Sequence, residues 1–571
     1  MRVRERLTRL VTFLNREPST VLAVAAAIGV VTGLLVIVFY RTIDLVQRVA
    51  LEGAVRATAP LTLTVPLLVA VGLALSRALV RWGARDSDAE NIPDVMHAVA
   101  VRAGRVQPWP VAVKTAASAL VIGLGGSVGP EGPIVVAGAA AGSRIGRWFR
   151  ASPERLKTLV GAGAAAGIAA AFNAPIAGVL FAVEKILGAF GAPALGPVVA
   201  AAVLASVVAR AAFGDDPVIG IPTEYGVGTA AEIGLYAVLG LVTGLVAVLY
   251  TRGVYKTQDW VARLRHPWVA VAAAIVVVGV LDVVFRADLW GRGHESLDLG
   301  IVVDRAPWFL LALAFAKLAA TAASLAAARA GGVLTPALFI GGTVGGAFGL
   351  VFGAQPQAFA LVGMAGLVAG ATHAPLTAMM MVFEMTGDYG LILPLMLVSA
   401  LAYLIARRLH PESIYTEWLA RRGIHLSHGA DAALLARLSV ADSYDRRPRV
   451  LGEDAALGAM LTALREGRQT DLPVVDADGR LVGVVTALDV RELLSREASL
   501  AGLIVAGDVM RDAPEMLVPH DSLLTALRRF GARDAPLLPV VDNRRDRRLL
   551  GVLTRADLFA TYERGLTEAA V

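Results

Sequence analysis

The segment that decides the fold reads Gly-Gly-Ser-Val-Gly-Pro-Glu-Gly-Pro over residues 125–133, and apolar sequence flanks it on both sides. Residues 115–130 and 134–143 carry no charge, so Glu131 is the single carboxylate in this stretch. Membrane-embedded charges are costly unless they line a polar cavity, and helix N-termini after Gly/Pro breaks direct N–H groups at ligands. The pattern predicts an anion site with an ionisable gate. The alternative is a glutamate in an interfacial loop that reaches water.

The composition indicates a membrane protein, because 56% of the 571 residues are hydrophobic and only 18% are charged. Six uncharged runs approach the ~20 residues that cross a bilayer. They are Val21–Tyr40, Ala57–Ser76, Leu159–Val183, Ile186–Ala209, Ile233–Thr251 and Tyr389–Ala406. Residues 330–383 have no Asp, Glu, Lys or Arg and must hold more than one helix. We expect a multi-pass α-helical protein.

Charge at the N-terminus predicts the orientation. Five arginines stand against two glutamates in the first 17 residues, so the positive-inside rule places this end in the cytoplasm. The segment lacks the pattern of a cleaved signal peptide. The net charge of +6 suits an anionic membrane surface and requires no nucleic acid. The absence of cysteine excludes disulfides and thiolate metal sites, and we predict no metal site.

The chain becomes soluble in character from about Val440 and repeats itself. The sequence Leu-Pro-Val-Val-Asp occurs at residues 472–476 and again at 538–542. Each copy is predicted to form a helix, a strand, a polar turn, a second strand and a helix. Thr486 and Thr554 end the second strands, and Asp489 and Asp557 follow three residues later. These residues suit either a helix cap or a grip on a nucleotide ribose.

The membrane part also repeats. Asn173-Ala-Pro and Glu184 correspond to His373-Ala-Pro and Glu384, each 200 residues later. Pro133 and three following glycines correspond to Pro336 and three glycines, each 203 residues later. Two halves with matching Gly/Pro breaks are typical of transporters whose site lies at the repeat interface. Ordinary helix kinks would explain each break singly but not their matching positions. We interpret His373 as a packing or capping residue.

These motifs together resemble the CLC family of chloride channels and chloride/proton antiporters, followed by two cystathionine-β-synthase-type (CBS) domains. Gly129–Pro133, residues 332–336, Asn173-Ala-Pro and Tyr415 carry the resemblance. It implies two inverted-topology repeats with broken helices, and cytoplasmic α/β tandem CBS domains. The expected division is an N-terminal arm 1–18, a membrane domain 19–420 with halves 19–213 and 228–410, a linker 421–440, and CBS domains 441–500 and 501–571.

The resemblance also implies roles for individual residues. Glu131 would be the gating glutamate, which occupies an outer anion site when ionised and swings away when protonated. The anion would be bound around Gly129, Pro130 and Gly132, the backbone amides of Val333 and Leu334, and the Tyr415 hydroxyl. A homodimer with one pathway per subunit is implied, and adenine nucleotide (ATP, ADP or AMP) is a candidate ligand of Thr486, Asp489, Thr554 and Asp557. No cofactor is required.

Three positions depart from the family pattern. Glu90 replaces a serine whose hydroxyl would touch the anion, so its carboxylate must point away, be protonated or pair with a cation. Leu334 replaces a phenylalanine. Lys185 replaces the internal proton-relaying glutamate of the antiporters, beside a retained Glu184. Lys185 either still passes protons or is a fixed cation that weakens proton coupling. We expect its helix to end nearby and its ammonium group to reach the cytoplasmic interface.

Three classes of function compete. Anion transport explains the repeat, Glu131, Tyr415 and the CBS pair together. A CBS-containing divalent-cation transporter or channel would need clustered intramembrane carboxylates, and a membrane-embedded enzyme would need a catalytic motif, such as HExxH, that is missing. We therefore predict a non-enzymatic transporter of chloride or a similar small anion, in a bacterial inner membrane. Channel and antiporter both remain open.

Overall fold

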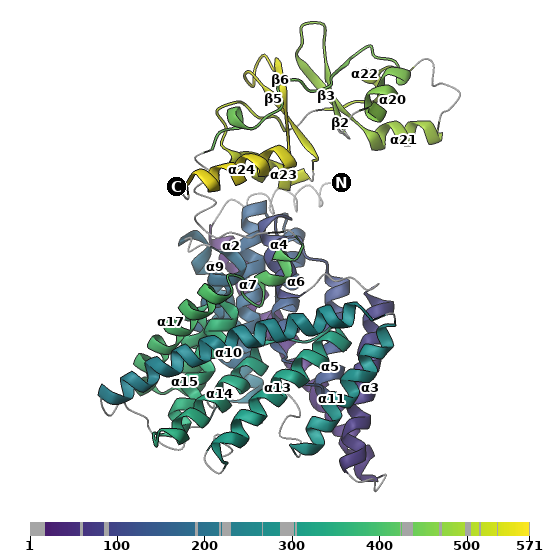
Figure 1. The fold of residues 1–571 in the computed structure, drawn as a ribbon. Coiled ribbons are helices and arrows are strands. Elements are labelled where there is room, and N and C mark those ends of the chain that lie inside the picture. Colours follow the sequence, from purple (N-terminus) through teal and green to yellow (C-terminus); the bar gives the residue numbers. More distant parts are fainter. Residues whose placement is uncertain are drawn as a thin grey trace. The chain divides into compact units, whose positions relative to one another are not determined.

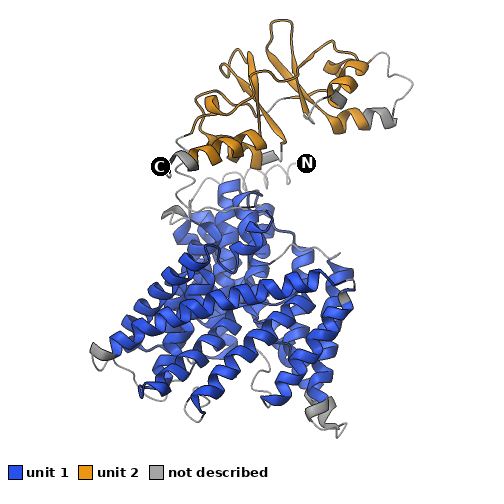
Figure 2. Cartoon of the chain, viewed as in Figure 1, with its two compact units in different colours: residues 1–426 blue, residues 427–571 orange. Residues whose placement is uncertain are grey.

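The computed structural model divides the chain into two compact units, residues 1–426 and 427–571 (Figure 2). We call them the membrane unit and the C-terminal unit. The boundary falls inside the expected linker 421–440. The structure describes residues 18–56, 61–84, 91–188, 192–215, 219, 230–264, 266–285, 302, 305–422, 424, 435, 438–466, 471–496, 504–512, 515–533 and 535–569.

The membrane unit is helical throughout its described residues (Figure 1). The first half contains α2 (Pro18–Arg56), α3 (Leu61–Gly83), α4 (Ile92–Ala100), α5 (Pro108–Gly123), α6 (Glu131–Trp148), α7 (Pro153–Phe172), α8 (Pro175–Phe181), the π-helical turn η1 (Ala182–Leu187) and α9 (Ala192–Phe213). The second half contains α10 (Ala230–Ala262), α11 (Pro267–Val284), α13 (Pro307–Ala328), α14 (Leu334–Val351), α15 (Pro356–Thr372), α16 (Pro375–Thr386), the short η2 (Tyr389–Leu391), α17 (Ile392–Leu409) and α18 (Thr416–Ala420).

The ends of corresponding helices show the repeat. α7 and α15 each begin with a proline in the first turn, where the missing N–H costs no hydrogen bond. They end at Asn173 (φ 52°) and His373 (φ 55°), both left-handed C-caps followed by Ala-Pro. The next helices, α8 and α16, start at those prolines. The capping role expected for His373 is confirmed.

Seven helices among the described residues are long and apolar enough to cross a membrane. Two of the uncharged runs do not form the single spans that we expected. Leu159–Val183 is broken after Phe172 into α7 and α8, and Ile186–Ala209 is interrupted because η1 ends at Gly188 (φ 70°) before α9 begins. Length and hydropathy cannot detect such breaks, because Asn-Ala-Pro and Gly are uncharged. Residues 330–383 hold α14, α15 and α16, which confirms that this run contains more than one helix.

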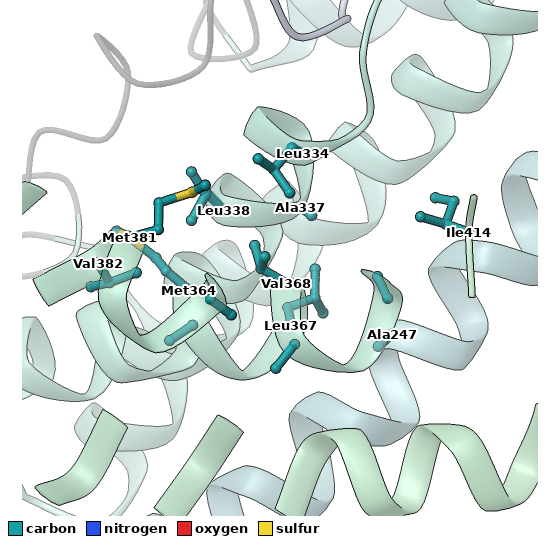
Figure 3. Packing of buried hydrophobic residues seen from close by; sticks show 14 of the residues in the cluster. Ala247, Leu334, Ala337, Leu338, Met364, Leu367, Val368, Met381, Val382 and Ile414 are labelled. Carbon is teal, nitrogen blue, oxygen red and sulfur yellow. The ribbon is translucent and has the colours of Figure 1, made fainter. Parts of the chain in front are cut away.

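Close helix contacts in both halves depend on glycine. A Cβ at Gly138 of α6 would overlap the Gly163 carbonyl of α7, and a Cβ at Gly341 of α14 would overlap the Gly363 carbonyl of α15. Such glycines let helix backbones approach closely in lipid. α15 is buried along nearly its whole length, and Met364, Leu367 and Val368 pack against α14 and α16 in the core (Figure 3).

The C-terminal unit contains two similar hairpins. The first sheet has the order β1-β2-β3-β4, from β1 (Leu451–Gly452), β2 (Asp471–Val475), β3 (Leu481–Thr486) and β4 (Arg511–Asp512). β5 (Leu537–Val541) pairs with β6 (Leu549–Thr554). The register shifts at corresponding positions of the two hairpins, between Val474 and Val475 and between Val540 and Val541. Helices α20 (Leu457–Glu466), α21 (Ala487–Arg496), α22 (Ala506–Val509), α23 (Leu523–Arg533) and α24 (Arg555–Ala569) complete the unit. The expected element order of each copy is confirmed.

Candidate functional site

The two Gly/Pro breaks of the membrane unit meet each other directly. The Gly129 N–H donates to the Gly332 carbonyl at 2.9 Å, and the Gly332 N–H donates to the Gly129 carbonyl at 2.7 Å. This pair joins the segments that precede α6 and α14, two helices of 18 residues each. Two helix N-termini, one from each repeat, therefore begin beside a shared two-bond bridge, as the repeat pattern predicts.

Glu131 is the first residue of α6, and its carboxylate lies on the N-terminus of α14. Oε1 accepts a hydrogen bond from the Leu334 N–H at 2.5 Å, and Oε2 accepts one from the Thr335 hydroxyl at 2.9 Å. The side chain is fully buried. A carboxylate at a helix N-terminus is stabilised by unpaired N–H groups and by the helix dipole. Glu131 therefore does not reach water, and its partners are those of a bound anion.

A cavity of about 580 Å³ adjoins this bridge within the membrane unit. Gly132, residues 331–333 and Tyr415 line it. The Tyr415 side chain is 3% exposed, and its hydroxyl has no hydrogen-bond partner among the described residues. A buried hydroxyl without a partner is costly, so this group is suited to donate to a ligand in the cavity.

The charges around the cavity favour anions. Four cationic side chains line it, and Asp259 is the one acidic side chain among its described lining residues. The cations are Arg77, Lys114, Arg329 and Arg422. Asp259 is itself bound to Arg421 at 2.5 Å. A concave surface of one charge sign raises the local concentration of ions of the opposite sign.

The remaining residues expected at the anion site have mixed outcomes. Gly129 does not offer its N–H to an anion, because that group is used in the bridge to Gly332. Pro130 has no N–H and is the N-cap of α6. Glu90 lies outside the described residues. Its neighbour Asn91 does line the cavity, and its backbone N–H donates to the Asp94 carboxylate at 2.9 Å.

Glu184 and its counterpart Glu384 cap helices of the opposite repeat. Glu184 accepts from the Leu376 N–H at 3.2 Å and the Thr377 N–H at 2.8 Å, at the start of α16. Glu384 accepts from the N–H groups of residues 176 and 177, at 3.0 and 2.7 Å, at the start of α8. The two carboxylates therefore tie the repeats together in a crossed arrangement. Neither contacts Glu131.

Lys185 lies in η1, one turn before the helix ends at Gly188, so the expected helix end is confirmed. It does not pair with Glu184, whose carboxylate faces α16. Lys185 is only 8% exposed, whereas we expected its ammonium group to reach the cytoplasmic interface. The π-helical turn and the packing of η1 against α4 bury the side chain. The charged groups of Glu184, Arg407 and Glu412 act on it electrostatically.

Within each Thr/Asp pair of the C-terminal unit, the two residues are hydrogen-bonded to each other. Thr486 Oγ1 donates to Asp489 Oδ2 at 2.7 Å and accepts from the Asp489 N–H at 3.1 Å. Thr554 and Asp557 repeat this arrangement at 2.6 and 3.2 Å. Asp489 also pairs with Arg511. Both pairs are reciprocal caps of the helices that they start.

Sequence reasoning did not single out several residues of the site. Thr335 binds the Glu131 carboxylate, and Tyr250 binds the carbonyl of Val333, which lines the cavity. The cavity is also lined by Asn91 and Lys114. A signal existed for Thr335, which stands in the second break, and for Lys114, a charge inside an apolar run. Tyr250 gave no signal, because a tyrosine in an apolar helix is typical of ordinary packing.

Comparison with known proteins agrees with this geometry. Residues 71–407 match the family described as voltage gated chloride channel, and residues 440–496 and 506–564 match the CBS domain. The chain is 35% identical over 419 residues to a putative chloride channel protein ClcB-like of Ralstonia nicotianae, covering 70% of this chain and 96% of the relative. It is 31% identical over 432 residues to the H(+)/Cl(−) exchange transporter ClcA of Citrobacter koseri, covering 71% and 89%.

Among solved structures, a slow cyanobacterial Cl−/H+ antiporter matches with a TM-score of 0.63 and 27% identity, over 70% of this chain and 97% of that chain. The fold and the site define an integral membrane protein of two repeats, whose broken helices meet around a buried glutamate. The chain belongs to the voltage gated chloride channel family and carries tandem CBS domains.

Proposed function

We propose that this protein moves chloride, or a similar small anion, across a membrane, and that Glu131 is the gate. The observation that carries the proposal is the carboxylate of one repeat bound to the helix N-terminus of the other, at Leu334 and Thr335. An ionised Glu131 occupies the N–H group that an anion would use. Protonation removes its charge, weakens both bonds and makes the α14 N-terminus available to chloride. The ClcB-like and ClcA relatives support chloride as the substrate.

Transport by the purified protein in liposomes tests the gate. Glu131→Gln keeps the size of the side chain and removes its titration, so we expect anion efflux that no longer varies with pH and carries no coupled proton. Anion efflux and proton uptake are followed together, with Glu154→Gln as the control, because Glu154 is an exposed glutamate on α7. Unchanged pH dependence in Glu131→Gln would contradict the assignment. The same measurement on the unmodified protein distinguishes a channel from an antiporter.

The protein is further proposed to be a homodimer with one pathway in each subunit, in a bacterial inner membrane, with both termini in the cytoplasm. Exposed apolar side chains on α8, α9, α16 and α17 suit contact with lipid or a second copy; they include Ile176, Leu195, Val203, Val207, Leu376, Leu393 and Leu404. The arginine-rich segment before residue 18, which lies outside the described residues, supports the orientation.

The CBS pair is proposed to bind an adenine nucleotide beside Thr486, Asp489, Thr554 and Asp557. Each pair lies at a strand-to-helix turn, and backbone N–H groups at the start of a helix can donate hydrogen bonds to anionic ligands. The reciprocal caps compete with this role, because they already use both side chains. Equilibrium binding of ATP, ADP and AMP to the full-length protein tests it. No binding of any of the three leaves these residues as helix caps.

A further inference from the structure

Helix α10 has no assigned role, yet it touches two sides of the anion site. It is a continuous helix of 33 residues with three buried tyrosines, and two of them, Tyr250 and Tyr255, lie beside the site. Tyr250 and Tyr255 are five positions apart, which corresponds to about 7.5 Å along the helix axis. Buried tyrosine hydroxyls need a hydrogen-bond partner, and the partners of these two identify what the helix holds.

The Tyr250 hydroxyl donates to the Val333 carbonyl at 2.7 Å. That carbonyl belongs to the same planar peptide unit as the Leu334 N–H, because a peptide bond joins the C=O of one residue to the N–H of the next. The Leu334 N–H is the group that binds the Glu131 carboxylate. Tyr250 therefore holds, from the opposite edge, the peptide plane that faces the gate.

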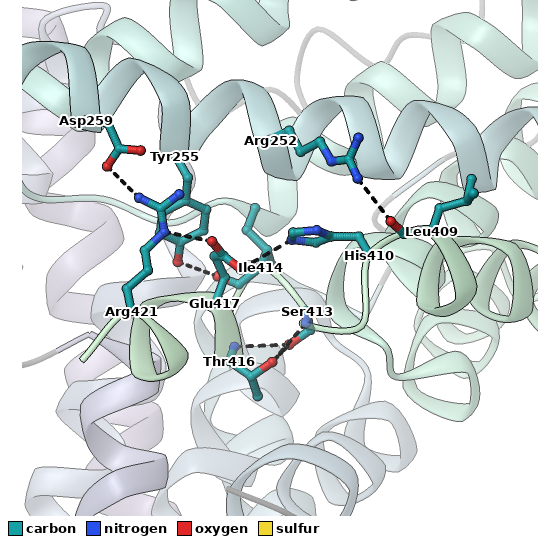
Figure 4. Close-up of polar contacts among 10 residues, drawn as sticks. All are labelled: Arg252, Tyr255, Asp259, Leu409, His410, Ser413, Ile414, Thr416, Glu417 and Arg421. Atoms are coloured by element: carbon teal, nitrogen blue, oxygen red, sulfur yellow. Dashed lines mark hydrogen bonds and ion pairs between the residues drawn. The ribbon is translucent and has the colours of Figure 1, made fainter. Parts of the chain in front are cut away.

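Tyr255 holds the other side of the cavity in the same way. Its hydroxyl donates to the Ile414 carbonyl at 2.7 Å, in the peptide unit that leads into Tyr415 (Figure 4). The Ile414 N–H donates to the Ala371 carbonyl at 2.8 Å, so both edges of this residue's backbone are bound.

The segment after Tyr415 is fastened to the same helix. The Arg421 guanidinium lies over the Tyr255 ring, 4.7 Å from its centroid, and binds Asp259 of α10 at 2.5 Å and Glu417 of α18 at 2.7 Å (Figure 4). Arg252 of α10 donates to the Leu409 carbonyl at 3.0 Å. Contacts from Arg252, Tyr255 and Asp259 thus fix residues 409–421 on both sides of Tyr415.

We infer that Tyr250 and Tyr255 are positioning residues for anion selection: α10 sets the separation between the α14 N-terminus and the Tyr415 hydroxyl. The inference rests on the proposed function of this site. A rigid helix with one hydrogen bond to each of these two walls, the α14 N-terminus and the Tyr415 segment, keeps the distance between them constant. That distance decides how well anions of different size and shape are bound by both walls at once. Loss of either bond frees one wall and lowers the discrimination.

The test uses the full-length protein in liposomes and compares efflux of chloride with efflux of nitrate and thiocyanate. Tyr250→Phe and Tyr255→Phe each remove one hydroxyl and keep the ring. We expect each to change the chloride-to-nitrate rate ratio by about fivefold, the factor that corresponds to the loss of one buried hydrogen bond. Tyr40→Phe is the matched control, because the Tyr40 hydroxyl also donates to a backbone carbonyl, that of Ala171, away from the site. Its ratio should stay unchanged.

Tyr415→Phe is measured in parallel to separate two failures. A changed ratio in Tyr415→Phe with unchanged ratios in both α10 variants overturns the inference and leaves the proposed site intact. An unchanged ratio in all three variants overturns both the inference and the proposed anion site. If Tyr255→Phe does not fold, Arg421→Gln takes its place, since it loosens the same segment; Arg408→Gln, an exposed arginine on α17, is its control. A loss of thermal stability without a change in the ratio counts as a structural role and overturns the inference.

Discussion

The Glu131 carboxylate makes two bonds of different kinds to α14. One comes from the Leu334 backbone N–H, which side-chain substitutions other than proline leave in place, and the other comes from the Thr335 hydroxyl. Hydrogen bonds to a charged acceptor are stronger than neutral ones, so Thr335 stabilises the ionised Glu131 in this position, which is the proposed closed state. It is also the one partner of Glu131 that a point substitution can remove without altering the backbone.

Thr335→Val should therefore increase anion flux at high pH, where Glu131 is ionised, by about tenfold, the factor expected for one hydrogen bond to a charged group. At low pH, where a protonated gate is already open, flux should change little. Liposome efflux at several pH values measures this. Thr343→Val is the control, since Thr343 lies on the same helix but bonds its own turn. Equal effects of the two variants would show that Thr335 has no special role at the gate.

By the family resemblance, Lys185 is expected to stand where the antiporters carry a proton-relaying glutamate. The structure buries it in a π-helical turn and gives it no direct bond to Glu184. A lysine that remains protonated is a fixed cation on the side of the proton route, and it relays protons poorly.

We predict that proton coupling in this protein is weaker than in relatives with glutamate at this position. The reversal potential in a liposome pH gradient at fixed chloride should shift only slightly, and Lys185→Glu should increase the shift. Arg408→Glu, a charge reversal at an exposed site on α17, should not. A shift as large as that of a tightly coupled antiporter in the unmodified protein would refute the prediction.

The crossed caps at α8 and α16 join elements from the two repeats. Each carboxylate satisfies two of the N–H groups that a helix leaves unpaired at its start. Because each glutamate and the helix that it caps belong to different halves, the caps stabilise the interface between the repeats as well as the helices.

Replacement of either cap by alanine should lower the stability of the purified protein by about 1–2 kcal/mol, as for other helix caps. The double variant Glu184→Ala with Glu384→Ala should lower it by more than either single variant. Thermal unfolding in detergent gives the order of the variants, and Glu154→Ala is the control for loss of an exposed carboxylate. If the caps contribute nothing, the unmodified protein, both single variants and the double variant will unfold at the same temperature.

The proposed gate, the cavity and its cationic lining all come from residues of one chain within the membrane unit. Two pathways in a dimer should therefore work independently. A Cβ at Gly332 would overlap the Glu131 carboxylate, so Gly332→Leu should block the pathway that contains it.

Dimers with one blocked and one unmodified subunit should keep about half of the flux of the unmodified dimer, because the second pathway is unaffected. Tandem purification with two different tags isolates the mixed dimers, and liposome efflux compares them with both parents. Nearly complete loss of flux in the mixed dimer would indicate one shared pore.

Local chemistry made much of this protein predictable from its sequence. Glu131 stood out because one carboxylate in an uncharged stretch must have a function or a partner. The repeat was visible because the Ala-Pro pairs recur at a constant spacing of 200 residues, and the Thr486 and Thr554 turns followed from strand and cap patterns. The helix end at Asn173 was misjudged within an uncharged run, because hydropathy does not report backbone geometry, whereas the helix end near Lys185 was expected and lies at Gly188.

The tertiary structure alone decided which groups meet. Glu131 and Leu334 are 203 positions apart, and Tyr250 lies 83 positions from Val333. No periodicity relates such residues, because their distance depends on how whole helices pack. The sequence determined that two broken helices and one buried carboxylate exist. Packing determined that the carboxylate of one repeat caps the helix of the other, and that two tyrosines of α10 hold the walls around it.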